Sequence, residues 1–215
     1  MFLDPDVTRY IHLKAMVGDH FTVRKLLEED PSKVHSTNGR LTVPPLFYAC
    51  RYGHLKVCQV LLEFRANLHH QVQGWAPLHE ACAHNHVHVV EFLLSNGVDP
   101  DAALKYSGMT ALMHAARRNF VPTCRLLVER GADLWARNVD GKTALEFATE
   151  PGSKVYPYLE REMKREMLWK AWAITDKGLG HHPLPLPTIS YVSGVLHHVL
   201  QAFPQDLFVE CLTYL

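Results

Sequence analysis

Apolar and polar positions along this chain recur in blocks of nearly constant length. Three blocks begin at Val43, Trp75 and Met109, and each carries small alanines in its first half and paired apolar residues in its second half. The first leucine of each block, and of a partial fourth, recurs after 32, 34 and 33 residues: Leu46, Leu78, Leu112 and Leu145. A period near 33 predicts a stack of similar helix–turn–helix units.

Turn residues stand at fixed distances inside each block. Gly53, Asn85 and Asn119 follow the first helix, and both residue types tolerate the left-handed conformation that ends a helix. Gly97 and Gly131 then end the second helix in two of the blocks. The alanines that allow close packing of the first helices are Ala49, Ala81 and Ala115. Each block is therefore predicted to form two short helices joined by a tight turn.

These blocks resemble ankyrin repeats over residues 8–150, through their T-P-L-H-x-A-like start and their G-A-D-like final turn. The resemblance implies an all-α solenoid of helix–turn–helix units with β-turn fingers, followed by C-terminal capping helices. It also implies a concave surface, made of the fingers and the exposed side of each first helix, that binds a partner protein. Lys14 marks a degenerate first repeat, because it stands where the other repeats have alanine.

The chain is expected to divide into five segments. They are a degenerate N-terminal repeat (1–41), three full repeats with a partial fourth (42–153), an amphipathic capping helix (154–176), a Gly/Pro/His linker (177–188) and an apolar helical tail (189–215). Trp169 and Trp172 leave the apolar stripe of the capping helix and favour the alternative that this helix binds a partner. The tail is too apolar to stand alone, so it packs on the solenoid or on another protein.

The last residues of the tail are similar to two ligase-recruiting motifs. The stretch 206–215 resembles the L-x-x-x-C-x-x-x-L core of a SOCS box, a motif that follows ankyrin repeats in one family of ubiquitin-ligase receptors. The stretch 203–215 is alternatively similar to the opening of an F-box. Both resemblances imply a substrate-recognition subunit that recruits the ligase core through residues 188–215.

Composition and charge narrow the class of partner and the compartment. The chain has 215 residues, 22 Lys+Arg and 22 Asp+Glu, so its formal net charge is zero and a globally polybasic nucleic-acid or lipid binder is disfavoured. Asp4 and Pro5 interrupt any N-terminal signal sequence, and no apolar run is long enough to span a membrane. Five cysteines without a C-x-x-C pair indicate reduced thiols. We expect a monomer in the cytoplasm or nucleus with no nucleic-acid or membrane partner.

Candidate catalytic and metal-binding patterns have structural explanations. Residues 140–143, Asp-Gly-Lys-Thr, look like part of a phosphate-binding loop, but the repeat register makes them a finger turn. His84 and His88 have a metal-ligand spacing, yet the register places them on different helices. His54 and His79 stand where the resemblance implies structural hydrogen bonds. With no nucleophile–base or paired-carboxylate pattern, we expect no enzyme activity, cofactor or metal.

The resemblance assigns the partner-binding positions residue by residue. They are Arg51, Tyr52, Trp75, His84, Tyr106, Met109, Arg117, Arg118 and Lys142. Tyr, Trp, Met and Arg are enriched in protein interfaces. Trp75 is the strongest candidate anchor, with the alternative that it packs against Tyr106 or Met109 of the next finger. The arginines and Lys142, joined by protonated His84, predict a locally basic surface suited to an acidic segment of the partner.

Overall fold

The described part of the computed structural model is helical and covers residues 5–37, 43–72, 74–149 and 152–179, with the backbone alone given for 5–9 and 168–179. The helices are α1 (Pro5–Val17), α2 (His20–Glu29), η1 (Pro31–His35), α3 (Pro45–Tyr52), α4 (Leu55–Glu63), α5 (Pro77–Ala83), α6 (Val87–Ser95), α7 (Ala111–Arg117), α8 (Val121–Glu129), α9 (Ala144–Phe147) and α10 (Val155–Leu179). Within these residues no β-strand forms, and one isolated bridge pairs Val72 with Trp75. The all-α prediction is confirmed.

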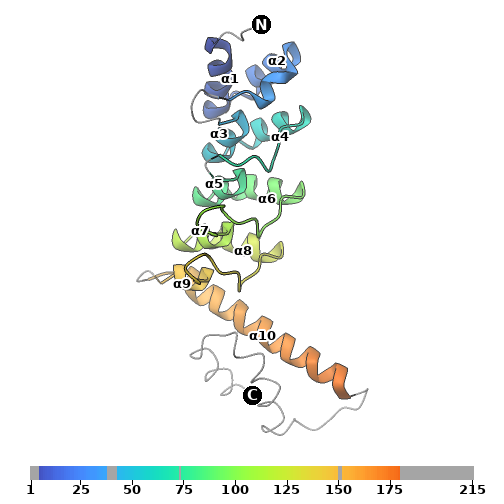
Figure 1. Ribbon diagram of the computed structural model, residues 1–215, viewed down its shortest axis with the longest axis vertical. Coiled ribbons are helices and arrows are strands. Elements are labelled where there is room, and N and C mark those ends of the chain that lie inside the picture. The colour runs from blue at the N-terminus through green and yellow to red at the C-terminus, as the bar shows by residue number, and fades with distance from the viewer. Residues whose placement is uncertain (1–4, 38–42, 73, 150–151, 180–215) are drawn as a thin grey trace. The chain divides into compact units, whose positions relative to one another are not determined.

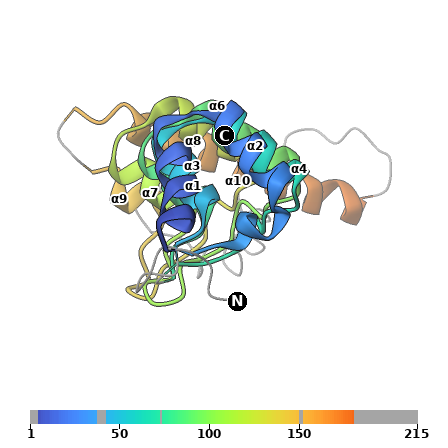
Figure 2. The same ribbon diagram turned by 90° about the horizontal axis from the view of Figure 1, so that it is seen from above.

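Paired helices stack in register along the first 157 residues, which form one compact unit. The odd-numbered helices α1, α3, α5, α7 and α9 pack on one another as an inner row, and α2, α4, α6 and α8 form an outer row (Figure 1). Figure 2, which looks along the stack, shows the helices gathered on one side and the connecting loops projecting from the other as fingers. This is the repeated helix–turn–helix architecture that the period of 33 predicts.

The inner and outer helices of each repeat are joined by turns that also contact the next repeat. Gly53 has a φ of +77°, and a side chain there would overlap the ring of His86 from the following repeat. That ring donates from Nε2 to the backbone oxygen of Arg51 over 2.9 Å, and His54 makes the equivalent bond to the oxygen of Met16 over 2.8 Å. The predicted structural hydrogen bond of His54 is confirmed, and His86 makes the matching bond one repeat later.

Asparagine replaces glycine in the next two turns and uses its side chain. Asn85 and Asn119 have φ values of +59° and +58°, in the left-handed region. The Oδ1 atom of Asn85 accepts a hydrogen bond from Oγ1 of Thr123 over 2.7 Å. The Oδ1 atom of Asn119 accepts from the backbone N–H groups of Lys154 and Val155, over 2.9 and 3.1 Å. Asn119 therefore satisfies donors at the start of α10, as an N-cap side chain does.

The core between the two rows is built from the repeated leucines and small residues. Leu46, Leu78 and Leu112 are almost fully buried, as are the alanines at the close contacts between inner helices. The described cysteines are free and buried: Cys50, Cys58, Cys82 and Cys124. Burial raises the pKa of the Cys124 thiol to about 12, so this group stays protonated and behaves as a small apolar side chain.

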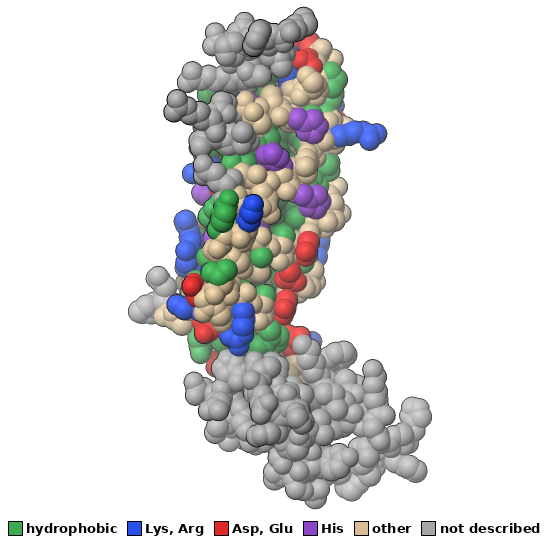
Figure 3. Space-filling view, in the orientation of Figure 1, with side chains coloured by type: hydrophobic (Ala, Val, Ile, Leu, Met, Phe, Trp, Pro, Cys, Tyr) green, Lys and Arg blue, Asp and Glu red, His purple; other side chains and the backbone are tan. Residues whose placement is uncertain are grey.

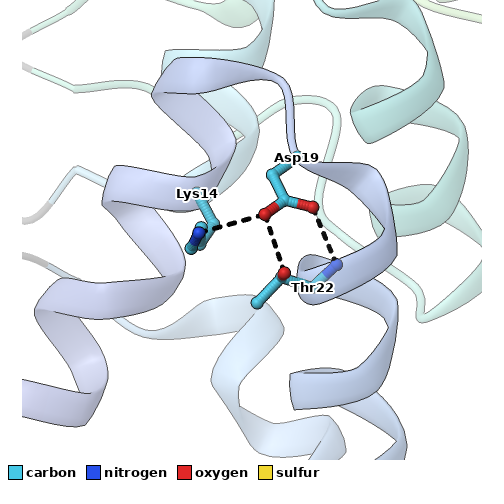
Figure 4. Close-up of polar contacts among 3 residues, drawn as sticks. All are labelled: Lys14, Asp19 and Thr22. Carbon is cyan, nitrogen blue, oxygen red and sulfur yellow. Dashed lines mark hydrogen bonds and ion pairs between the residues drawn. The ribbon is translucent and has the colours of Figure 1, made fainter.

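The side of the first repeat that faces away from the second repeat carries a charged group at the position where the following repeats have alanine. Lys14 occupies the position of Ala49, Ala81 and Ala115, and its Nζ lies 3.0 Å from Oδ2 of Asp19 (Figure 4). The same carboxylate caps α2, since it accepts from Oγ1 of Thr22 over 2.7 Å and from the Thr22 N–H over 3.0 Å. A lysine is too long and too polar for the close helix contact that alanine permits, so this face is not built like the contacts between repeats.

The chain from Tyr158 onward belongs to a second unit. Its described part is the long body of α10, in which Leu159 and Met163 are buried at a four-residue spacing. Glu160 and Lys164 pair across one turn over 3.5 Å. No helix among the described residues has the length and apolar character needed to cross a membrane. The side chains of Trp169 and Trp172, most of the predicted linker and the whole tail lie outside the described residues, and the capping role stays a prediction.

Candidate partner-binding surface

Five of the predicted binding residues lie at the same end of three stacked inner helices. Arg51 and Tyr52 are the last two residues of α3, and His84 is the C-cap residue of α5. Arg117 is the last residue of α7 and Arg118 is its C-cap residue. All five are exposed, and α5 packs against both α3 and α7. Figure 3 shows Lys and Arg side chains along the left edge of the stack, at the level of α7. We call these five residues the inner-helix surface.

A buried carboxylate lies beneath this surface. Glu80 of α5 is 8% exposed, with its Oε2 atom 3.6 Å from Nδ1 of His84 and 4.0 Å from Nε of Arg51. Burial raises the pKa of Glu80, whereas the positive charges of Arg51, His84 and Arg118 oppose that rise. The sequence carries one signal for this unpredicted site, a glutamate at the repeat position where the flanking repeats have Tyr48 and His114.

His84 is held in one orientation by its own helix. Its Nδ1 atom lies 3.0 Å from the backbone oxygen of Glu80. Because a carbonyl oxygen only accepts, Nδ1 carries the proton and donates it, which leaves Nε2 to take up a second proton. Protonated His84 then places a positive charge between Arg51 of the preceding repeat and Arg118 of the following one.

Trp75 is half-buried and packs into the stack. It contacts the buried cluster of Val43, Phe47 and Val72, and its ring lies 4.7 Å from that of His114 between centroids. Trp75 is therefore not a fully exposed anchor, and the alternative contact with Tyr106 or Met109 stays a prediction. The short finger before α5 places the indole against this cluster, because Val72 and Trp75 exchange two backbone hydrogen bonds of 2.8 and 2.9 Å there.

Two neutral histidines lie under Trp75. His79 and His114 are almost fully buried, with ring centroids 5.9 Å apart and perpendicular planes. Burial lowers the pKa of His79 to about 4, and nearby backbone groups of Met109 and Ala102 offset part of the effect. Neither ring nitrogen of His79 has a partner with full hydrogen-bond geometry. Backbone groups of Met109 and Ala102 still interact with the ring, so the structural hydrogen bond predicted for His79 stays a prediction.

The fingers of the third and fourth repeats present apolar side chains to solvent. Tyr106 is 73% exposed and Val139 is 69% exposed, and the N–H of Val139 donates to the oxygen of Ser107 over 3.1 Å, which joins the two fingers. Lys142 is exposed on the same finger as Val139. Met109, in contrast, is only 7% exposed. Met109 is a core residue, and its assignment to the binding surface is corrected.

The patterns that suggested chemistry are accounted for by local structure. His84 and His86 lie at the two sides of the α5–α6 turn with stacked rings 6.2 Å apart, and no group of three or more metal-ligating side chains gathers in the described ranges. The Asp140–Thr143 segment is a finger turn, in which Oδ1 of Asn138 accepts from the N–H groups of Asp140 and Lys142 over 3.1 and 2.8 Å. The helix that follows, α9, has only four residues.

Comparison with known proteins agrees with this architecture. A family model described as ankyrin repeats (3 copies) matches residues 11–103 and 100–162. The human ankyrin repeat and SOCS box protein 11 is 35% identical over 119 residues, which are 55% of this chain and 36% of that protein. The probable E3 ubiquitin-protein ligase XBOS33 of Oryza sativa subsp. japonica is 38% identical over 116 residues, or 53% of this chain and 22% of that protein.

A third relative shows the same repeats in a different protein. The human SH3 and multiple ankyrin repeat domains protein 2 is 30% identical over 145 residues, which are 66% of this chain and 8% of that protein. The chain thus spans about a third or less of the length of these curated relatives. The family model covers most of the described stack of helices, so the stack has the ankyrin-repeat fold. The chain belongs to the ankyrin-repeat family.

Proposed function

We propose that this chain is a non-enzymatic adaptor that binds an acidic segment of a partner protein on the inner-helix surface and the neighbouring fingertips. The observation that carries the proposal is the convergence of Arg51, His84, Arg117 and Arg118 from three consecutive repeats on one edge. Exposed Tyr52 and Tyr106 add aromatic groups of the kind enriched in interfaces. Cations from successive repeats can pair with successive carboxylates of one extended segment.

The test is charge reversal on the inner row against the same change on the outer row. The double variant Arg117→Glu/Arg118→Glu is compared with Lys25→Glu/Lys56→Glu, which reverses two exposed charges on α2 and α4. Proteins captured by the wild-type chain are identified by mass spectrometry and assayed with purified variants. We expect the inner-row variant to weaken binding at least tenfold, or about 1.4 kcal/mol, with the outer-row variant unchanged. Equal loss in both variants would contradict the assignment of the surface.

A second candidate function is a substrate-recognition subunit of a ubiquitin ligase. It is supported by the relatives named as a SOCS box protein and as a probable ubiquitin ligase, together with the two motif resemblances of the tail. Residues 188–215, which would recruit the ligase core, lie outside the described residues. Pull-down with the full chain and with a chain ending at residue 179 separates the two candidates. Capture of elongin, cullin or Skp-type adaptors by the full chain alone supports the ligase role, and capture by neither chain removes it.

We also propose a cytoplasmic or nuclear location. The four described cysteines are free and buried, which is typical of proteins from reducing compartments. Imaging of the full chain fused to a fluorescent protein at either end tests this proposal, and secretion of the fusion would contradict it.

A further inference from the structure

Glu80 is an unusual residue for the middle of an inner helix. Its Oε2 atom is buried and has no hydrogen-bond partner among the described residues. The nearest cationic atoms, on His84 and Arg51, lie 3.6 and 4.0 Å away, beyond normal hydrogen-bond distance. A buried acceptor without a donor costs free energy, more so when it is charged. The ionised form of Glu80 is therefore stabilised by positive charges that lie beyond hydrogen-bond distance.

The groups that face Glu80 come from all three packed inner helices. Helix α3 supplies Arg51 and the thiol of Cys50, α5 supplies His84, and α7 supplies Arg118. Desolvation favours the protonated carboxyl, and the three cations favour the carboxylate. Because these effects oppose each other, a change in nearby charge shifts the balance between the two forms.

An acidic segment bound on the inner-helix surface makes such a change. Its carboxylates would pair with Arg51, His84 and Arg118, the same cations that keep Glu80 ionised. Two carboxylates that share one set of cations repel each other, and the buried one is the costlier to keep charged. Protonation of Glu80 removes this repulsion.

We propose that Glu80 is the internal counter-ion of the inner-helix surface, and that it takes up a proton from solvent when a carboxylate-rich segment of a partner binds there. The inference rests on the proposed function, because it requires an acidic partner. Its consequence is that binding tightens as the pH falls from 8 to 6. Glu80 thus makes the affinity of this surface dependent on pH.

The test uses poly-L-aspartate as the probe, because its carboxyls stay ionised between pH 6 and 8. Isothermal titration of the full chain in buffers of different ionisation enthalpy gives the number of protons taken up on binding. The key variant is Glu80→Gln, which keeps the shape of the side chain and removes its charge. The matched control is Glu91→Gln, whose exposed carboxylate on the outer helix α6 pairs with Arg130 over 3.0 Å.

We expect wild type and Glu91→Gln to take up a fraction of a proton at pH 7 and Glu80→Gln to take up measurably less. Glu80→Gln should bind the probe about fivefold more tightly than wild type at pH 8, which corresponds to about 1 kcal/mol. At pH 6 the two affinities should differ by less than about twofold. Identical proton uptake in wild type and Glu80→Gln would overturn the inference.

Two further outcomes separate this inference from the proposed function. If wild type binds poly-L-aspartate without proton uptake, the role of Glu80 is wrong and the acidic-partner proposal stands. If no binding occurs between pH 6 and 8, the acidic-partner proposal fails and this inference fails with it. If Glu80→Gln does not fold, Glu80→Met, an uncharged side chain of similar length, replaces it in the uptake measurement, because uptake by wild type alone does not identify the group that takes up the proton.

Discussion

Two buried histidines show how a single side chain can set the acid stability of a repeat. His79 stands at the repeat position of Phe47, and His114 stands at that of Tyr48. Burial, together with the charges of neighbouring groups, lowers the pKa of His114 to about 3, and burial lowers that of His79 to about 4. Both rings are neutral at pH 7 and stand at positions that aromatic side chains occupy in the repeat of α3 and α4.

This arrangement predicts a loss of stability in mild acid. In the unfolded chain both histidines bind protons near pH 6.5, whereas in the folded chain they stay neutral to a lower pH. Their contribution to stability is therefore complete above pH 6.5 and is lost as the pH falls toward 4 for His79 and toward 3 for His114. The slope is at most about 1.4 kcal/mol per pH unit for each ring. Urea denaturation at pH 7, 6 and 5 should show a shallower decline for the double variant His79→Phe/His114→Tyr.

The protonation of Glu80 changes stability with pH in the opposite direction to that of the two histidines. The double variant His79→Phe/His114→Tyr is therefore compared with wild type, because both proteins contain Glu80. Its pKa is raised by burial, so its contribution to stability is present below pH 4.5 and is lost as the pH rises through the folded-state value. Glu80 is unchanged in the double variant, and the difference from wild type therefore reports the histidines. Parallel declines in the two proteins would show that the histidines are not the cause.

At the scale of elements, the turns decide where helices begin and end. The turn positions predicted from the sequence, Gly53, Asn85 and Asn119, all have positive φ. What the sequence did not indicate is that Asn119 also caps α10 of the following segment through its side chain. The partner donors lie 35 and 36 residues away, and no local pattern relates a turn residue to a helix start at that distance.

The two roles of Asn119 can be separated by substitution. Asn119→Gly keeps the left-handed turn and removes the capping oxygen, which should cost about 1 kcal/mol of stability. Asn119→Ala removes the cap and also strains the turn, so we expect a cost of about 2 kcal/mol. Urea denaturation gives both values, and hydrogen exchange of the Lys154 and Val155 amides should accelerate in both variants. Unchanged exchange of these amides would exclude the cap.

At the scale of the whole molecule, the side of the first repeat that faces away from the second repeat carries both apolar and charged side chains. Among the described side chains of α1 and α2, the exposed large hydrophobic ones are Tyr10, Leu13, Val17 and Phe21. Lys14 lies among them, 5.2 Å from the centroid of the Tyr10 ring and paired with Asp19. A charge inside an apolar face opposes association with another such face, because the charge would have to be desolvated.

Removal of this charge should cause self-association. In Lys14→Ala the face gains the small residue that the inner repeats use for close helix contact, so we expect dimers to form at least tenfold more readily than in wild type. Sedimentation velocity over a range of protein concentrations measures this effect. Lys25→Ala, which removes an exposed lysine from α2, is the control and should sediment like wild type. Monomeric Lys14→Ala would show that other features keep the chains apart.

The sequence by itself determined the repeat, its helices and its turns, because these depend on spacings that recur every 33 residues and on residues such as Gly53 whose conformational preference is local. It also identified the arginines at the ends of the inner helices. The tertiary structure decided which neighbours each side chain meets. Trp75 packs against the buried cluster of Val43, Phe47 and Val72, and Met109 is buried. Glu80 is surrounded by cations from the repeats on either side. Burial and charge at these positions are set by groups from other repeats, and only stacking brings those groups together.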